Sequence, residues 1–235
     1  MSVYNIANLN IKIVPKSKYV SLKLLSYITN AEDFDFDATV SIKDIKYEIQ
    51  ISEYDDEAMA EFIAIFRKIC KTVLIRYNGM FLHSAAVKYK NKAYLFSAPS
   101  GIGKTTHVRL WKAYLGSQVE IINGDKPLLR EENGIINVYG NPWQGKEDYG
   151  CNTFAPLGGI LILERAAVNS ASKAPATMAL KSLLSQTLRP NQKEYVNSLF
   201  DFLSKILKTI PIINLKCNIS QEAVQTALNA IEKYL

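Results

Sequence analysis

The sequence predicts an α/β protein in which a sheet flanked by helices follows a small β-rich N-terminal extension. Short apolar strand patterns alternate with helical patterns along the chain, and this favours a largely buried sheet covered by helices. A glycine-rich stretch that ends in Gly103-Lys104-Thr105 lies between one predicted strand and one predicted helix. The order strand, loop, helix, strand is therefore the centre of the predicted fold.

Residues 1–56 are predicted to form the extension, because apolar and polar residues alternate there as in short strands. The apolar positions of this pattern are Ile11, Ile13, Val40, Ile42, Tyr47, Ile49 and Ile51. Residues 57–235 are predicted to form the main domain. It begins with an amphipathic helix over 57–77, whose apolar residues recur at spacings of four and three.

The main domain continues with alternating elements. Strands are predicted over 85–89, 93–96, 119–122, 135–139, 158–163 and 212–215, and helices over 105–115 and 221–235 with Leu235 on the buried stripe of the last. Lys90-Asn91-Lys92 is predicted to form the turn between the first two strands. Together these elements complete one sheet with helices around it.

Composition narrows the class of protein. Hydrophobic residues make up 48% of the 235 residues and charged residues 21%, as in ordinary globular proteins. No leader pattern and no run of eighteen apolar residues occurs, and Cys70, Cys151 and Cys217 have no C-x-x-C spacing. We therefore expect a cytoplasmic protein with reduced thiols and no membrane partner.

The net charge of +6 raises the question of a nucleic-acid partner. The lysines are scattered, and acidic residues gather at 32–37 and 55–57, where they would repel a phosphate backbone. We therefore predict no nucleic-acid partner, and the sequence leaves a homo-oligomer open.

The glycine-rich loop follows the pattern G-x-x-x-x-G-K-[ST], with alanine at the first glycine position. The predicted phosphate-binding residues are Ala98, Pro99, Ser100, Gly101, Ile102, Gly103, Lys104, Thr105 and Thr106. Amides at a helix N-terminus attract phosphate, Lys104 adds a point charge, and the Thr105 hydroxyl is a ligand for Mg²⁺. This pattern predicts ATP and Mg²⁺ as the cofactors but does not choose between a kinase, another NTPase and a nucleotide-binding regulator.

Several polar residues near this loop have both a functional and a structural interpretation. His83 precedes a predicted strand, and Asp125 ends another 21 residues after Lys104. Asp125 could hold Mg²⁺ or accept a proton from an acceptor hydroxyl, or it could be a turn residue of Asn123-Gly124-Asp125. In the loop 140–147, Trp143 could be a core anchor, while Lys146 and Glu147 offer a phosphate contact and a metal ligand; Glu164 and Arg165 could form an ion pair.

Four spaced segments resemble the bacterial HPr kinase/phosphorylase-like family, whose members are related to phosphoenolpyruvate carboxykinases. These segments are Leu82-His83-Ser84-Ala85-Ala86-Val87, the loop through Lys104-Thr105-Thr106-His107, Asn123-Gly124-Asp125 and Gly140-Asn141-Pro142-Trp143-Gln144-Gly145-Lys146-Glu147. The resemblance runs from about 82 to 165. It implies that His83 and Lys104 contact the reacting phosphates, that Asp125 is the catalytic base, and that Thr105 and Glu147 belong to metal sites.

The chain also departs from this family. Gly124-Asp125 stands where HPr kinases usually carry two aspartates, and the loop that grips the HPr protein is not found. The sequence is closer to small stand-alone kinases of the group, some of which resemble free-serine kinases or modify peptides. The predicted activity is Mg²⁺-dependent transfer of the γ-phosphate of ATP to a serine-like hydroxyl of a small molecule or peptide. The alternatives are a regulatory nucleotide-binding module and a carboxykinase-like enzyme.

Overall fold

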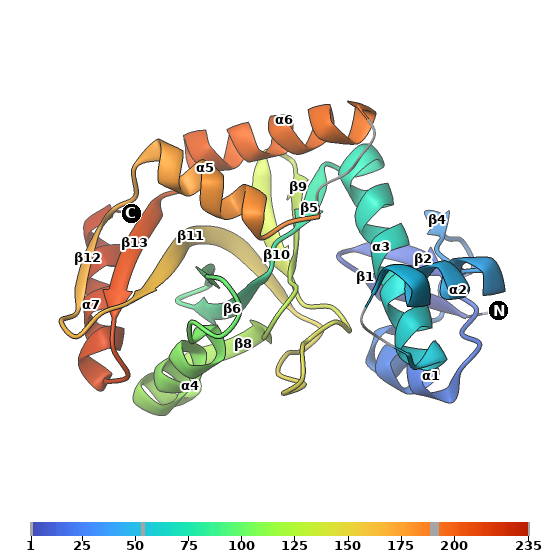
Figure 1. The fold of residues 1–235 in the computed structure, drawn as a ribbon, viewed down its shortest axis with the longest axis horizontal. Helices are drawn as coiled ribbons and strands as arrows, with labels where there is room; N and C mark the ends of the chain where they lie inside the picture. Colours follow the sequence, from blue (N-terminus) through green and yellow to red (C-terminus); the bar gives the residue numbers. More distant parts are fainter. Residues whose placement is uncertain (1, 53–54, 189–192, 235) are drawn as a thin grey trace.

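The computed structural model describes residues 2–52, 55–188 and 193–234, and it is a curled mixed sheet flanked by helices, with a smaller unit at the N-terminal end (Figure 1). The helices are α1 (Lys18–Leu24), α2 (Ile42–Ile51), α3 (Glu57–Arg76), α4 (Lys104–Leu115), α5 (Ala176–Ser185), α6 (Lys193–Thr209) and α7 (Gln221–Tyr234). The strands are β1 (Val3–Ile6), β2 (Leu9–Lys12), β3 (Ile28–Thr29), β4 (Phe36–Asp37), β5 (Gly79–Phe81), β6 (Ser84–Tyr89), β7 (Lys92–Ser97), β8 (Val119–Asn123), β9 (Leu128–Glu132), β10 (Ile135–Tyr139), β11 (Phe154–Arg165), β12 (Ser170–Lys173) and β13 (Ile212–Cys217).

The N-terminal unit differs from the predicted set of strands. Its sheet has the order β3-β1-β2-β4, but residues 42–51, predicted as strand, form helix α2. Ser41 and Asp44 make a reciprocal capping box at the start of this helix, and Ile45 and Glu48 are buried at a spacing of three. The helical spacing outweighs the alternation of apolar residues, so the strand prediction is wrong here and the unit mixes helices with strands.

The main sheet has the strand order β5-β9-β10-β11-β7-β6-β8, and β13 pairs with β11. β7 is parallel to β11, while β6 is antiparallel to both β7 and β8. The predicted hairpin of β6 and β7 is confirmed, with Lys90 and Asn91 in the left-handed region at its turn. The C-terminal ends of β7, β8 and β11 and the start of β6 therefore meet at one edge of the sheet.

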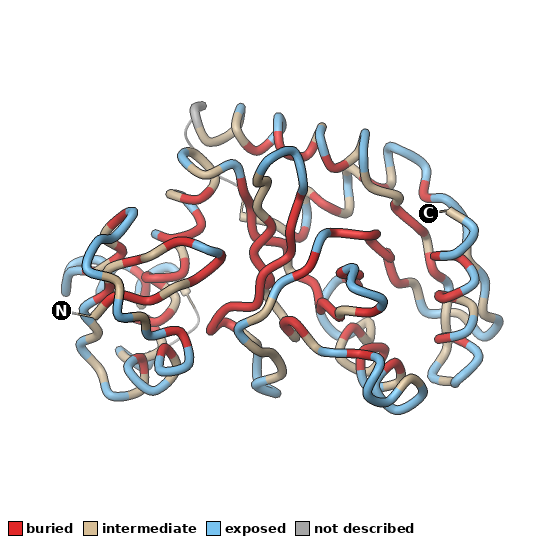
Figure 2. Tube along the Cα trace, turned by 180° about the vertical axis from the view of Figure 1, so that it is seen from behind, coloured by how far each residue is buried: buried red, intermediate tan, exposed pale blue. Residues whose placement is uncertain are grey.

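Helices cover both faces of this sheet. α5 and α6 pack with one face, and α4 and α7 pack with the other. Figure 2 shows the buried strands between helices whose outer sides are exposed. α5 and α6 fall in a stretch for which the sequence analysis predicts no element, and Leu235 lies outside the described residues. No described helix combines the length and apolar content that crossing a bilayer requires.

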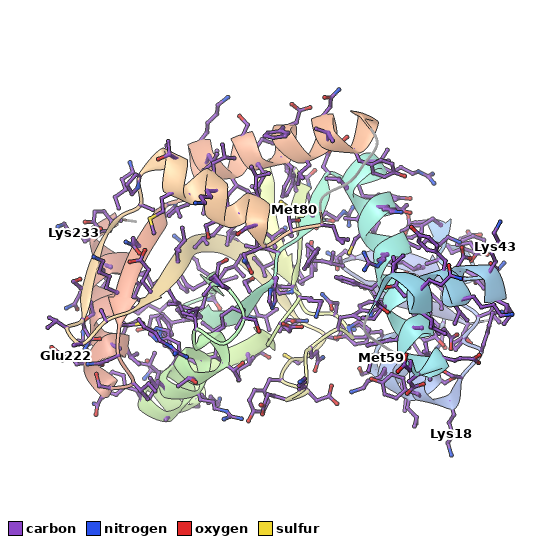
Figure 3. The ribbon with its side chains drawn as sticks, in the orientation of Figure 1. Lys18, Lys43, Met59, Met80, Glu222 and Lys233 are labelled. Atoms are coloured by element: carbon purple, nitrogen blue, oxygen red, sulfur yellow. The ribbon has the colours of Figure 1, made fainter. Side chains whose placement is uncertain are left out.

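Apolar residues pack the helices against each face of the main sheet, and a separate apolar cluster joins the N-terminal unit to the sheet through α3. Its members come from the N-terminal strands and α1, from α3, and from Phe81, Leu128, Tyr139 and Trp143. Figure 3 shows Lys18 and Lys43 on the outer side of this unit, with Lys233 and Glu222 at the opposite end of the molecule. The sheet edge described next lies between these two ends.

Candidate functional site

The glycine loop (residues 98–106) leaves the sheet at the end of β7 and enters α4. Gly101 and Gly103 have φ angles of 79° and 124°, a region that disfavours side chains. Ala98, which replaces the first glycine of the pattern, is not among the residues with positive φ. The alanine is therefore tolerated because its position does not need glycine.

The start of α4 has open hydrogen-bond donors. Gly103 is its N-cap, and no side chain caps the helix there. The first amides of an α-helix have no partner within the helix, and the helix dipole adds positive charge at this end. Ser100 and Gly101 are exposed, and Thr105 and Thr106 are partly exposed. The loop therefore offers an anion a set of accessible N–H groups.

Lys104 folds back over this loop. Its Nζ donates a hydrogen bond of 2.8 Å to the carbonyl oxygen of Ala98, and the residue is buried. Burial lowers the pKa of Lys104; the charge of Asp125 opposes that effect and the charge of Lys126 adds to it. The ammonium thus lies within electrostatic range of both residues at the end of β8.

The strand order brings His83 and Asp125 together. The amide of Ser84 donates to the carbonyl oxygen of Asp125 at 3.0 Å, which joins the start of β6 to the end of β8. His83 Nε2 then lies 3.0 Å from Asp125 Oδ1. The sequence separates these side chains by 42 positions, and the sheet edge makes them neighbours.

Lys126 completes the group, although no motif in the sequence marks it as a site residue. Its Nζ pairs with Oδ2 of Asp125, so both carboxylate oxygens have a partner. Burial alone would raise the pKa of the Asp125 carboxyl, but the hydrogen bonds and charges of His83 and Lys126 hold that pKa well below its usual range. The only sequence signal for Lys126 was its position directly after the strand-end aspartate.

Two buried asparagines fix the corner of the site, which is the turn at Asp125 and Lys126 directly after β8. Asn123 Oδ1 accepts from the amides of Asp125 at 2.9 Å and Lys126 at 2.7 Å. Asn141 Nδ2 donates to the carbonyl oxygen of Lys126 at 2.6 Å, and Asn141 Oδ1 accepts from the amide of Trp143 at 2.9 Å. Both asparagines are fully buried. Their side chains therefore hold the backbone of Asp125 and Lys126 in place from two sides.

The tryptophan loop (residues 140–148) packs beside Asp125. Trp143 is a core anchor: its ring stacks on Phe62 at 4.9 Å, and its Nε1 donates to the Phe62 carbonyl oxygen at 2.9 Å. Gly145 has a φ of 80°, and a Cβ there would lie 2.9 Å from Asp125 Cβ. Lys146 is exposed, and the exposed Glu147 pairs with Arg109 of α4 at 2.6 Å.

The fit of the predicted Mg²⁺ ligands depends on how many protein atoms the ion needs. Among the described residues, no three His, Cys, Asp or Glu side chains gather as a metal site. Mg²⁺ at nucleotide sites usually takes one or two protein ligands and completes its shell with phosphate oxygens and water. Thr105 at the loop and Asp125 at the same edge suit that mode, whereas Glu147 is engaged by Arg109. The three metal ligands remain a prediction.

A cavity of about 760 Å³ lies on the other side of the glycine loop. Its wall is made of Gly101, Ile102, Gly103, Thr106, His107, Leu110, Leu163, Glu164, Arg165, Ala166, Ala167, Cys217, Asn218 and Ile219. Arg165 Nε donates to the carbonyl oxygen of Ile102 at 3.1 Å, and its Nη2 donates to that of Gly101. Arg165 therefore holds the loop, and no ion pair with Glu164 appears among the described residues.

Comparison with known proteins adds little to this site. No protein-family model matches the chain, and no curated protein matches its sequence. Among solved structures, the chain is similar to the Hpr(Ser) kinase/phosphatase from Coxiella burnetii, with a TM-score of 0.34 and 11% identity over 66% of this chain and 93% of that one. A likeness at this level carries no argument, so the functional conclusion must come from the site itself.

Proposed function

We propose that this chain is a Mg²⁺-dependent phosphotransferase that moves the γ-phosphate of ATP to a serine-like hydroxyl. The observation that carries the proposal is the meeting of the open glycine loop with the His83–Asp125 pair at one sheet edge. Phosphoryl transfer needs mainly positioning and cations around the phosphates, with a group that orients the acceptor. The loop amides, Lys104, His83 and Asp125 would supply these elements.

The chain's own groups would divide the work as follows. The loop amides and Lys104 bind phosphate oxygens, and His83 assists there. Thr105 would hold Mg²⁺, which supplies charge neutralisation at the phosphates. Asp125, paired on both oxygens in this structure, is a weak proton acceptor in that state, so we assign it first to orienting the acceptor hydroxyl.

The cavity beside the glycine loop favours a nucleotide, with its base and sugar, as the ligand. It adjoins Gly101 and Gly103, and Ile102, Leu110 and Leu163 give it apolar walls. A volume of about 760 Å³ is of the size that small-molecule sites have. We propose that the nucleoside lies here, with the phosphates reaching over the loop.

A regulatory module that binds ATP without turnover is the second candidate. It is favoured by the engagement of both Asp125 oxygens and by glycine at position 124, where the resembled family has an aspartate. A carboxykinase-like enzyme fits less well because it would need a second metal site. The chain has only one other histidine, His107, which is buried and accepts a hydrogen bond from Trp111 at 3.1 Å.

The test has a binding step and a transfer step. Calorimetry with ATP and Mg²⁺ on the wild type and on Lys104→Ala should show affinity that the folded variant loses, because the site loses its buried cation. Transfer of label from γ-labelled ATP is then screened over free hydroxyl amino acids and peptides. Binding without transfer to any acceptor or to water favours the regulatory module. Equal ATP affinity in both proteins excludes the glycine loop as a phosphate site.

A further inference from the structure

The charges around Asp125 do not balance. Lys104, Lys126 and His83 are three basic groups, and Asp125 is the carboxylate that interacts with all three. Neighbouring acids on the tryptophan loop are paired elsewhere: Glu147 with Arg109 at 2.6 Å and Asp148 with Lys23 at 2.5 Å. The corner therefore carries surplus positive charge, which suits a highly charged anion.

Lys126 differs from Lys104 in how it is held. Its amide donates to Asn123 at 2.7 Å and its carbonyl accepts from Asn141 at 2.6 Å, so its backbone is fixed. Its side chain is 30% exposed, and within the described part of the chain its Nζ forms an ion pair with the adjacent Asp125 alone. A lysine has a four-carbon stem, so the ammonium can exchange this partner for another without any backbone movement.

We propose that Lys126 is a further catalytic residue, whose ammonium leaves Asp125 when nucleotide binds and contacts the transferring phosphoryl group together with Lys104. The inference rests on the proposed function. In the transfer, the acceptor oxygen forms a bond to the γ phosphorus, and the bond from that phosphorus to the bridging oxygen breaks. The electron pair stays with the departing diphosphate, and the hydroxyl proton passes to Asp125, which is a better proton acceptor once Lys126 has left it. Lys126 keeps its protons and neutralises charge on the phosphoryl oxygens.

The experiment compares ATP with ADP, because only ATP carries the phosphoryl group that Lys126 would contact. Calorimetry with Mg²⁺ measures both affinities in the wild type, Lys126→Met and Lys126→Arg. Lys88→Met is the matched control, since Lys88 also pairs with a carboxylate, that of Glu120 at 3.7 Å, and its side chain is also 30% exposed. Hydrolysis of ATP in the absence of an acceptor gives a second readout.

We expect Lys126→Met to weaken ATP binding about ten- to hundredfold, the range for a hydrogen bond between charged groups. Its ADP affinity should stay within about threefold of wild type, a change well below that of a lost ionic contact. Lys126→Arg should keep most of the wild-type preference for ATP over ADP, and Lys88→Met should keep all of that preference. Hydrolysis should fall with the ATP affinity.

Two results would overturn the inference. If Lys126→Met keeps the wild-type ratio of ATP to ADP affinity, Lys126 is only a counter-ion of Asp125. If the wild type binds neither nucleotide, the proposed function and this inference both fail. If Lys126→Met does not fold, Lys126→Gln replaces it, and an unchanged ratio in that variant counts equally against the proposal.

Discussion

The two glycine-containing loops at the sheet edge look similar in sequence but are built in opposite ways. The glycine loop leaves Pro99, Ser100 and Gly101 exposed and has no side-chain cap at the helix that follows. The tryptophan loop turns its first residues inward, where Asn141 and Trp143 are buried and hydrogen-bonded. A loop with open amides at a helix start is suited to a ligand, and a loop with its polar groups satisfied is suited to supporting its neighbours.

Asp125 lies where the two loops meet, and its substitution should have the largest effect on the proposed reaction. Asp125→Asn keeps the size and one oxygen but loses charge and basicity, so transfer should fall by about two to four orders of magnitude with ATP affinity nearly intact. Rates at saturating ATP and calorimetry measure the two quantities. A defect that shrinks as Mg²⁺ rises would assign Asp125 to the metal instead, and full transfer by the variant would contradict the kinase mechanism.

A substitution in the tryptophan loop should lower the stability of the fold and leave ATP binding nearly unchanged. Trp143→Ala removes a ring packed on Phe62 and Phe66 at 4.9 and 5.0 Å, and we expect a loss of about 3–5 kcal/mol in the free energy of unfolding. Urea unfolding measures this. Below the transition, the folded fraction should still bind ATP with near wild-type affinity. A stable variant that has lost ATP binding would reverse the roles of the two loops.

The pH dependence of stability should reveal the burial of His107 in α4, the helix that follows the glycine loop. Burial lowers its pKa to about 4 from about 6.5, so the neutral form is favoured in the fold. The unfolded chain binds this proton more readily, so the contribution of His107 to stability should be constant above pH 7 and decrease as the pH falls from about 6.5 to about 4. The loss from this group is about 3 kcal/mol.

The control for that prediction is His107→Gln, which has no titrating group at this position. Urea unfolding of both proteins at pH 7 and pH 4.5 should give a smaller decrease for the variant, whatever its stability at pH 7. Equal decreases would show that His107 is protonated in the folded protein.

Arg165 should give the smallest effect. It donates to the carbonyl oxygens of Gly101 and Ile102 from an exposed position, so Arg165→Ala should weaken ATP binding about tenfold and leave unfolding almost unchanged. Arg109→Ala is the matched control, because Arg109 lies on α4 but bonds to Glu147 rather than to the loop. Equal ATP affinities for the two variants would remove Arg165 from the support of the loop.

The sequence predicted the centre of the sheet better than its surroundings. β7, α4 and β8 follow from local apolar patterns, and Gly101 and Gly103 stand where the backbone needs them. α2 was missed because its apolar residues also alternate, although the Ser41–Asp44 capping box and the spacing of Ile42, Ile45 and Ile49 both favour a helix. α6 carried a usable signal, since Leu199, Phe202, Leu203 and Ile206 are all buried at helical spacings.

The residues of the candidate site could be selected from the sequence only where residue type and motif position are enough. Motif spacing selected Lys104, His83 and Asp125, and the sheet edge explains why His83 and Asp125 meet. Lys126 and Arg165 could not be assigned in the same way, because their contacts depend on an asparagine-supported turn and on the end of a neighbouring strand. Such pairings are set by tertiary geometry and leave no periodic trace in the sequence.

The positions of the two tryptophans give the molecule a built-in pair of optical probes. Trp111 lies in the cluster beneath α4, and Trp143 lies in the cluster that joins α3 to the N-terminal unit. The chain contains no other tryptophan. Replacing either one with phenylalanine leaves a single tryptophan, so tryptophan fluorescence during denaturation would report on one cluster at a time and reveal whether the two melt together.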